Sequence, residues 1–479
     1  MRTILIVPLA VTALCMGRSG LCDTHYVSPE GSDQAPYLTP ETAARRVQSA
    51  LDAASAGDTV SVAPGEYDES VHMGSNVNLV GLGTDRTLLW GSVSAGTDSE
   101  IRGFGVAQDC PEDHPAYQPV AVLGPRAGGL ILADCRIRGT FQRAVECRAE
   151  GGFTLLVSCK VQGPPGGGTL WVSSQQSIGG HWLAVEDCVF EGAGVIAASP
   201  GHLGVWRSSF TGTAGPAVSV QGASGMVLGC SFDRCNTGLS VDGFTRITVE
   251  STALTRNGEY GLWCGDDPQI ELRNCTITGN ARGIGLNRAA VEAISSIIWG
   301  NTQDIALWPP EPAFYPEYCD VGDAAAWRDA RHNIDADPLF VDADAGDYRL
   351  RPESPCVDTG HPWSETLYGA YDLDGMPRVA YGGKEAYHRV DMGAYEYYIN
   401  RLSPGPEPEQ LTLTWSSREF RTYSIFYTDD LLTWHLAVGA LPAGEGLLVL
   451  TTSWTDDGSL TGLPPLLAPK RFYRVLENP

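Results

Sequence analysis

The sequence predicts an all-β protein whose main part is a parallel β-helix, with three short strands in each coil of about 22 residues. A column of small residues recurs at steps of 20 to 29 residues, at Cys135, Cys159, Cys188, Ser208, Cys230, Thr252, Cys275 and Ser296. A second column keeps the same period, at Cys147, Val172, Ala197, Val220, Val241, Cys264 and Leu286. A unit of this length cannot bury its own apolar side chains, so stacked coils must form the core and pair their strands in parallel.

One coil, residues 270–286, shows how the strands are arranged. Its apolar residues fall into three strands, 270–272, 275–277 and 284–286, and a bend at Arg273 and Asn274 separates the first two. Side chains alternate between the two faces of a strand, so every second one enters the interior. The 56 glycines and 31 prolines fit a protein with this many turns.

The first column explains much of the cysteine content. Five of the 13 cysteines occupy it, and a free cysteine packs as a small apolar residue in a stacked interior row. The spacing differs from the paired cysteines of zinc sites, so packing is favoured over metal binding or a redox role. Cys319 and Cys356 lie outside both columns, and a disulfide between them is an open alternative in an exported protein.

The N-terminal end combines a targeting segment with a cap. Residues 1–22 contain Arg2, an apolar run and then small residues, which predicts a secretory signal peptide. Thr39 is expected to cap a helix that has Pro40 at its first position and ends at Gly57. The apolar stripe of this helix would cover the first coil, through Val47, Ala50, Leu51 and Ala54.

The C-terminal end predicts a second unit. The β-helix with its cap is expected over residues 23–400, and residues 401–410 form a Pro-rich linker. Residues 411–479 alternate apolar and polar side chains, which predicts a small antiparallel β-sandwich. Carbohydrate binding, attachment and added stability remain open as the task of this module.

The charge excludes one class of partner. A net charge of −25 opposes binding to DNA or RNA, because neutralising phosphates needs a basic face. An anionic polysaccharide would need a local basic patch or bridging cations. After the signal peptide, no segment reaches the roughly 20 apolar residues of a membrane-spanning helix. We expect a monomer that is secreted or held at the cell surface.

Two parts of the chain resemble a known superfamily. The stretch "YVSPEGSD…AARRVQSALDAASAGDTVSVAPGEY" resembles the beginning of exported bacterial right-handed parallel β-helix proteins of the pectate-lyase-like superfamily. The stretch "NIDADPLFVDADAGDYRLRPESPCVDTG", with "VDMGAYEY" after it, is similar to the last coils of the same proteins. The resemblance spans residues 25–398 and implies a right-handed coil.

The resemblance also implies a function on the outer face of the coils. It implies binding or cleavage of extracellular polysaccharide, with lyase or hydrolase chemistry if the protein is catalytic. The paired-Asp, Gly-His-Gly and Arg-x-Lys signature of polygalacturonases is absent, as is a clear pectate-lyase pattern of calcium-binding aspartates with a partner arginine. Whether the protein is an enzyme therefore stays uncertain, and the alternative is a non-catalytic surface scaffold or adhesin.

Several charged residues are candidates for chemistry. Asp187 and Arg207 occupy the bend of neighbouring coils and are expected to touch, as a proton-transfer pair or as a surface ion pair. Asp266 and Asp267 follow a strand and either ligate calcium or only form a turn. Two histidines at the starts of adjacent coils are either a dyad or exposed loop residues, namely His181 and His202.

Binding residues are expected among exposed tryptophans and clustered aspartates. Trp171 and Trp263 are placed outward beside the second column, where they either stack on sugar rings or are covered by a loop. A cluster that lacks the glycine and glutamate of an EF-hand is either a calcium site or an acidic turn, namely Asp342, Asp344 and Asp347. An enzyme should bring acid, base and Trp263 into one groove, whereas a scaffold should leave them scattered.

Overall fold

The computed structural model describes most of the chain outside residues 1–21. The described residues are 22–109, 118–147, 151–163, 170–174, 180–198, 201–308, 313–322, 331–362, 371–376, 378, 389–398, 400–407, 409–417, 422–443, 451–468 and 470–478. The predicted signal peptide therefore lies outside them, except for the exposed Cys22. None of the helices in the described part of the chain has the length and apolar character that crossing a membrane requires.

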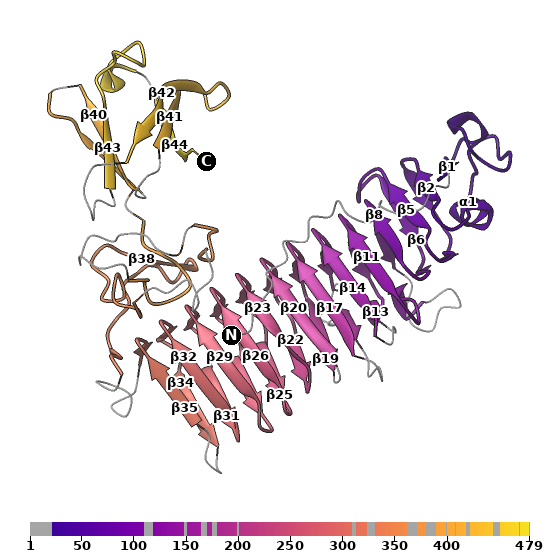
Figure 1. Cartoon of the computed structure of the whole chain (residues 1–479), viewed down its shortest axis with the longest axis horizontal. Coiled ribbons are helices and arrows are strands. Elements are labelled where there is room, and N and C mark those ends of the chain that lie inside the picture. Colours follow the sequence, from indigo (N-terminus) through magenta and orange to yellow (C-terminus); the bar gives the residue numbers. More distant parts are fainter. Residues whose placement is uncertain are drawn as a thin grey trace.

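Three parallel sheets wind around one interior, as the sequence predicts, and the coils stack along a single axis (Figure 1). Sheet A has 13 strands, in the order β1 (Thr24–Val27), β2 (Thr59–Val62), β5 (Asn78–Gly81), β8 (Ser99–Arg102), β11 (Gly129–Ala133), β14 (Phe153–Val157), β17 (His181–Glu186), β20 (Gly201–Trp206), β23 (Ser224–Leu228), β26 (Arg246–Glu250), β29 (Gln269–Arg273), β32 (Ala290–Ile294) and β35 (Ala313–Glu317).

The other two sheets follow the same order along the axis. Sheet B has 12 strands, which are β3 (Gly65–Tyr67), β6 (Thr87–Trp90), β9 (Gly105–Gln108), β12 (Arg136–Gly139), β15 (Lys160–Gln162), β18 (Val189–Glu191), β21 (Ser209–Thr211), β24 (Ser231–Asp233), β27 (Ala253–Thr255), β30 (Thr276–Thr278), β33 (Ile297–Ile298) and β36 (Asp320–Val321). Sheet C has 11 strands, which are β4 (Val71–His72), β7 (Val93–Ser94), β10 (Val120–Leu123), β13 (Arg143–Cys147), β16 (Leu170–Ser174), β19 (Ala193–Ala198), β22 (Pro216–Gln221), β25 (Thr237–Asp242), β28 (Tyr260–Gly265), β31 (Arg282–Asn287) and β34 (Gln303–Trp308).

The interior is filled by rows of like side chains. In sheet B, the rings of Phe190, Phe210 and Phe232 stack on three successive strands, with centroid distances of 4.5 and 4.9 Å. All three rings are buried, and each contributes roughly 1.5–3 kcal/mol through its removal from water. The strict alternation of the strands then sends the neighbouring side chains outward, where a functional face can form.

The predicted cysteine column is an interior row between sheets A and B. Its side chains accept hydrogen bonds from the backbone of the coil before, as in Cys159 N–H to Cys188 Sγ at 3.3 Å and Cys275 N–H to Ser296 Oγ at 3.1 Å. Cys319 was wrongly placed outside the column, because the Ser296 N–H donates to Cys319 Sγ at 3.4 Å and so continues the row. Burial raises the pKa of the Cys230 thiol to about 12, which keeps it protonated and unreactive.

The prediction of the second column was wrong in one coil. Cys147 pairs with Ser174, and Val172 pairs with Val145 instead. The step from Cys147 to its neighbour is thus two residues longer than predicted, and a shift of two residues leaves the inward and outward faces unchanged. The alternation of side chains therefore predicted the face of each residue correctly but not its neighbour.

The two cysteines for which a disulfide was considered are also free thiols. The structure has Cys319 and Cys356 as separate buried thiols, so the disulfide left open between them is not formed. Cys356 Sγ instead donates to Asp320 Oδ2 at 3.3 Å. The two thiols therefore have different hydrogen-bond partners.

Thiol titration should show this arrangement directly. In the folded protein, the ten buried cysteines among the described residues are expected not to react, because their side chains are closed off from solvent. After denaturation without a reductant, at least ten thiols should react. Recovery of fewer than five would mean that most cysteines are disulfide-bonded and would contradict the packed row.

The N-terminal cap is shorter than predicted. Thr39 caps a 3₁₀ turn, Pro40–Thr42, rather than the helix itself. The helix α1 runs only over Val47–Ala53, and its first amides donate to the buried Glu69 carboxylate, from Val47 N at 2.7 Å and Gln48 N at 3.2 Å. An acceptor from the next coil therefore replaces the local cap, and the predicted apolar face still covers the first coil.

The C-terminal module consists of two antiparallel three-stranded sheets. One contains β39 (Asn400–Pro404), β40 (Leu411–Ser416) and β43 (Thr451–Asp456), and the other contains β42 (His435–Pro442), β41 (Thr422–Thr428) and β44 (Phe472–Glu477). A short 3₁₀ turn, Pro465–Leu467, precedes β44. Part of the segment expected as a linker is a strand instead, because Asn400–Pro404 form β39, which pairs with β40. A buried core holds the module together, namely Leu413, Trp415, Tyr423 and Ile425.

Between the two units, a hairpin and a C-terminal segment lie against the last coils. The hairpin pairs β37 (Phe340–Asp342) with β38 (Asp347–Leu350). The described residues of the segment, 371–376, 378 and 389–398, contact the bends of sheet A, where Asn274 Nδ2 donates to Asp391 O at 2.9 Å and Ser251 Oγ donates to Tyr371 O at 3.1 Å. This C-terminal segment therefore covers one side of the coils from β26 onward.

Buried carboxylates in this region make stability depend on pH. Burial raises the pKa of Asp320 to about 7, and Asp304 and Asp335 raise it further, although the amide of Ala336 opposes the change. Because the ordinary value is near 4, the folded protein binds this proton more tightly than the unfolded chain. Its stabilising contribution is complete below about pH 4 and is lost as the pH rises toward 7.

Replacing this carboxylate should flatten the dependence. Between pH 5 and pH 7.5, the unfolding temperature of Asp320→Asn, measured by circular dichroism, is expected to fall less than that of wild type. Asp391, whose pKa burial also raises to about 7, leaves part of the slope in place. The exposed Asp344→Asn is the control and should follow wild type. Parallel curves for all three proteins would contradict the assignment.

Candidate functional site

The two tryptophans expected to bind sugars do not form one site. Trp171 lies on β16 in register with Gly194, whereas Trp263 lies on β28 in register with Ser240 and Gly285. The alignment that put them in one outward row failed because it was two residues off in this coil, where Ser173 rather than Trp171 pairs with Ile196 in the row that leads to Trp263. They remain on the outer face of sheet C, separated by three intervening strands.

Trp263 packs within an aromatic cluster. Its ring centroid lies 5.0 Å from that of Tyr260 and 5.3 Å from that of Trp308, and its indole N–H donates to Asp242 Oδ1 at 3.2 Å. The ring of Tyr260 is also covered by the guanidinium of Arg282, at 5.3 Å. The exposed surface of Trp263 is therefore limited by neighbours on adjacent coils.

The aspartates proposed as calcium ligands form turns. Asp266 and Asp267 take left-handed backbone conformations after β28, and Asp266 is ion-paired with Arg288. Asp342 accepts the amide of Ala345 at 3.0 Å within the β37–β38 turn. The neighbouring candidates are Asp344, which is exposed, and Asp347, whose carboxylate accepts from Arg349. Among the described residues, no three His, Cys, Asp or Glu side chains come together in a way that would hold a metal ion.

The two histidines do not form a dyad. His181 is buried, with Nε2 3.1 Å from Thr154 Oγ1, so it is not an exposed loop residue either. His202 is in register with Trp182 and points to the opposite face, where the two rings lie 5.7 Å apart. An offset of one residue along the strand places the two imidazoles on different sides of sheet A.

Asp187 and Arg207 are brought together, as the sequence predicts. Arg207 Nε and Nη2 donate to the two oxygens of Asp187 at 2.8 and 2.9 Å, and Glu186 is ion-paired with the same guanidinium. All three side chains lie at the end of sheet A where the chain bends into sheet B. Asp187 and Glu186 raise the pKa of Arg207, which opposes its use as a base for proton abstraction.

An aromatic face that the sequence did not reveal lies beside this ion pair. We define it as the outward side chains Phe153, Trp182, His202 and Trp206 of strands β14, β17 and β20. Phe153, Trp182 and His202 are directly in register on three adjacent strands, and Trp206 is in register with Glu186. Trp182 is 51% exposed and Phe153 is 40% exposed, so these rings are open to solvent.

Glycines allow two of these rings to lie flat on the sheet. A Cβ atom on Gly204 would lie 1.8 Å from the ring of Trp206, and one on Gly129 would lie 2.3 Å from the ring of Phe153. The rings therefore rest on backbone that carries no side chain, and they present their other faces outward. The sequence signal was the outward position of Trp182 and Trp206, which lie an odd number of residues from a buried valine, three from Val185 and one from Val205. An alignment of the second column alone does not show it.

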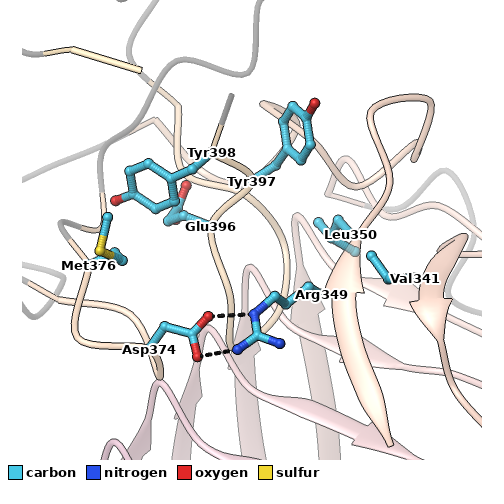
Figure 2. A pocket seen from close by; sticks show the side chains of 8 residues that line it. All are labelled: Val341, Arg349, Leu350, Asp374, Met376, Glu396, Tyr397 and Tyr398. Atoms are coloured by element: carbon cyan, nitrogen blue, oxygen red, sulfur yellow. Dashed lines mark hydrogen bonds and ion pairs between the residues drawn. The ribbon is translucent and has the colours of Figure 1, made fainter. Parts of the chain in front are cut away.

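A separate hollow lies at the C-terminal end of the coils. Its volume is about 480 Å³, and Figure 2 shows the residues that line it, namely Val341, Arg349, Leu350, Asp374, Met376, Glu396, Tyr397 and Tyr398. Arg349 donates to both oxygens of Asp374 at 2.7 and 2.9 Å. The charged side chains of Arg349 and Asp374 in this hollow thus pair with each other, whereas the aromatic face presents rings that are open to solvent.

Residues 144–308 match the family described as the right handed beta helix region. The protein is a right-handed parallel β-helix. The matched residues include the aromatic face and the ion pair of Asp187 and Arg207. A comparison of the sequence with curated proteins finds no match.

Solved β-helix structures are similar to this β-helix at low identity. The A-module of mannuronan C-5 epimerase AlgE6 from Azotobacter vinelandii is 12% identical, with a TM-score of 0.40, over 57% of this chain and 93% of that chain. Pectate lyase Pel9A is 12% identical, with a TM-score of 0.42, over 78% of this chain and 96% of that chain. The catalytic domain of a GH87 alpha-1,3-glucanase is 8% identical, with a TM-score of 0.28, over 63% and 68%. These values assign no activity to this chain.

Proposed function

We propose that this protein binds extracellular polysaccharide along the aromatic face of sheet A. The observation that carries the proposal is the row of exposed rings in register on consecutive strands. The apolar face of a sugar ring packs well on an aromatic ring, and exposed aromatic residues grouped on one surface mark binding sites. Export, expected from residues 1–22, would place this face in contact with extracellular glycans.

The arrangement favours a polymer that lies along the axis of the β-helix. Adjacent strands are about 4.8 Å apart, so the rings from Phe153 to His202 offer contacts at regular steps across three coils. A longer oligosaccharide covers more of these steps. Affinity is therefore expected to rise with chain length until the face is filled.

Binding without cleavage is better supported than a lyase mechanism. A lyase needs a base close to the sugar, and the raised pKa of Arg207 keeps its proton in place. The sequence-based candidates are also scattered, because Trp263, Asp266 and Asp267 belong to coils and edges other than those of Asp187 and Arg207.

A hydrolase is the second candidate function. Glu186 and Asp187 are two carboxylates beside Trp206, and glycosidases use two carboxylates that flank the scissile bond. Both are held by the same guanidinium, so cleavage would require at least one of them to leave Arg207. The non-catalytic scaffold remains compatible with binding, with the C-terminal module as its attachment unit.

One panel tests these alternatives together. The chain lacking residues 1–22 is incubated with plant, algal and bacterial polysaccharides, with and without calcium, and both retention on the polymer and products by mass spectrometry are recorded. Retention without products supports the proposal. Shortened or unsaturated products would establish catalysis, and Asp187→Asn should then abolish them. No retention and no product on any polymer would overturn the proposal.

A further inference from the structure

We infer that the polysaccharide bound at the aromatic face is uncharged, an inference that rests on the function proposed above. The argument concerns the charges on the outer face of sheet A. A polyuronate carries a carboxylate on every sugar residue, so a face that binds it needs several cations that are free of protein carboxylates, or bound metal ions that bridge the two.

Three arginines on the outer face of sheet A are paired with carboxylates. Arg207, which borders Trp206, is held by both Glu186 and Asp187, which leaves this group with one negative charge in excess. Further along sheet A, Arg102 is held by Glu100 at 2.7 Å and by Asp134 at 3.0 Å, and Arg273 is held by Glu271. These three arginines are thus matched by local carboxylates rather than directed to a ligand.

A carboxylated polymer would be repelled at these positions. A sugar stacked on Trp206 would bring its carboxylate next to Glu186 and Asp187, and the screening length of about 10 Å at 0.1 M salt exceeds the roughly 4.8 Å between strands. The net charge of −25 adds to this repulsion. Bridging by metal ions has no support among the described residues, where no group of ligands is assembled.

One cation at the edge of the face requires a control. Arg246 is exposed on β26, in the row of Phe153, Trp182 and His202, and its guanidinium donates to Gln269 Oε1 at 2.7 Å. A single arginine two strands beyond His202 can meet one carboxylate at most. It cannot compensate a charge on every sugar across three coils.

The test compares polymers that share one backbone. Polygalacturonate, its fully methyl-esterified form and its carboxyl-reduced form are immobilised, and binding of the full chain lacking only residues 1–22 is measured from 20 to 500 mM salt. We expect the two uncharged forms to bind at least about tenfold more tightly at low salt, with a difference that narrows as salt rises. The variant Glu186→Gln/Asp187→Asn, which frees Arg207, should gain affinity for polygalacturonate by at least about threefold.

Each other outcome has a defined meaning. Equal or tighter binding of polygalacturonate at low salt, lost in Trp182→Ala, would overturn the inference and keep the proposed function. Binding of polygalacturonate that is lost only in Arg246→Gln would also overturn the inference and would place the contact at that arginine. If none of the three polymers binds, other uncharged glycans retained in the panel described above are compared with their carboxylated derivatives; retention of none overturns both proposals.

Discussion

Replacing Trp182 and Trp206 with alanine is expected to weaken binding of the best-retained polysaccharide by about thirtyfold or more. Both side chains point to the outer face of adjacent strands, and Trp206 borders the ion pair of Asp187 and Arg207. Truncating an aromatic residue at the centre of an interface commonly costs about 2 kcal/mol or more of binding free energy. A loss of about 1.4 kcal/mol is a tenfold change in affinity. Isothermal titration with oligosaccharides of increasing length measures the loss.

The matched control is an exposed tryptophan outside the β-helix. Trp434 is 38% exposed and lies between β41 and β42 of the C-terminal module, so Trp434→Ala should leave affinity within about twofold of wild type. The unfolding temperature of the double variant should stay close to wild type, because neither ring belongs to the buried core. An equal loss in Trp434→Ala, or no loss in the double variant, would move the binding site away from sheet A.

The architecture followed from residues that face the interior. The interior of stacked coils accepts similar side chains at the same position of every coil. The row from Cys135 to Ser296 therefore revealed both the length of the repeat and the face of the strands that points inward. The alternation of apolar and polar residues after residue 410 likewise indicated antiparallel β structure at the C-terminal end. Such patterns are visible in a sequence because every coil must satisfy the same packing constraint.

The outer face is not subject to that constraint, and here sequence reasoning was less successful. Asp187 and Arg207 were found because both occupy the bend one coil apart, and their contact was confirmed. Trp171 was matched to the wrong neighbours because the step from Cys147 to Ser174 is two residues longer than the repeat alignment assumed. The flat seating of Trp206 on Gly204 depends on the register between strands and on side-chain rotation, which a repeat alignment does not contain.

The prediction of the cap helix failed for a related reason. Thr39 and Pro40 are ordinary signals for the start of a helix, and they do form a capped 3₁₀ turn. The longer helix begins at Val47 because the acceptor for its first amides is Glu69, which comes from the following coil. A local signal could not reveal a partner 22 residues away along the chain.

Replacing Arg378 with methionine is expected to destabilise the C-terminal segment by about 3–5 kcal/mol, because it leaves a buried carboxylate without its cation. The side chains of Arg378 and Glu396 are 1% and 0% exposed, and Arg378 Nη1 donates to Glu396 Oε1 at 3.2 Å. The same guanidinium donates through Nη2 to Ser251 Oγ at 2.8 Å and to Ala394 O at 3.0 Å. It therefore connects residues 389–398 to the bend that follows β26.

The loss is expected to depend on pH and to be reversible by a second change. Burial raises the pKa of Glu396, so without Arg378 this carboxyl can take up a proton, and the destabilisation should be smaller at pH 5 than at pH 8. Arg378→Met/Glu396→Leu should recover part of the stability, since replacing both members of a buried pair with apolar residues is often nearly neutral. Protease susceptibility of residues 371–398 and urea unfolding measure the effect, because the separate units need not unfold in one step.

The control is the exposed arginine of the neighbouring hollow. Arg349 donates to both oxygens of Asp374 but is 53% exposed, so Arg349→Met should cost less than about 1 kcal/mol. If the two arginine variants lose the same stability, burial is not what makes Arg378 important. If Arg378→Met alone releases the segment to protease while the far-ultraviolet spectrum stays β-type, the coils fold without the segment and the ion pair serves to close their C-terminal side.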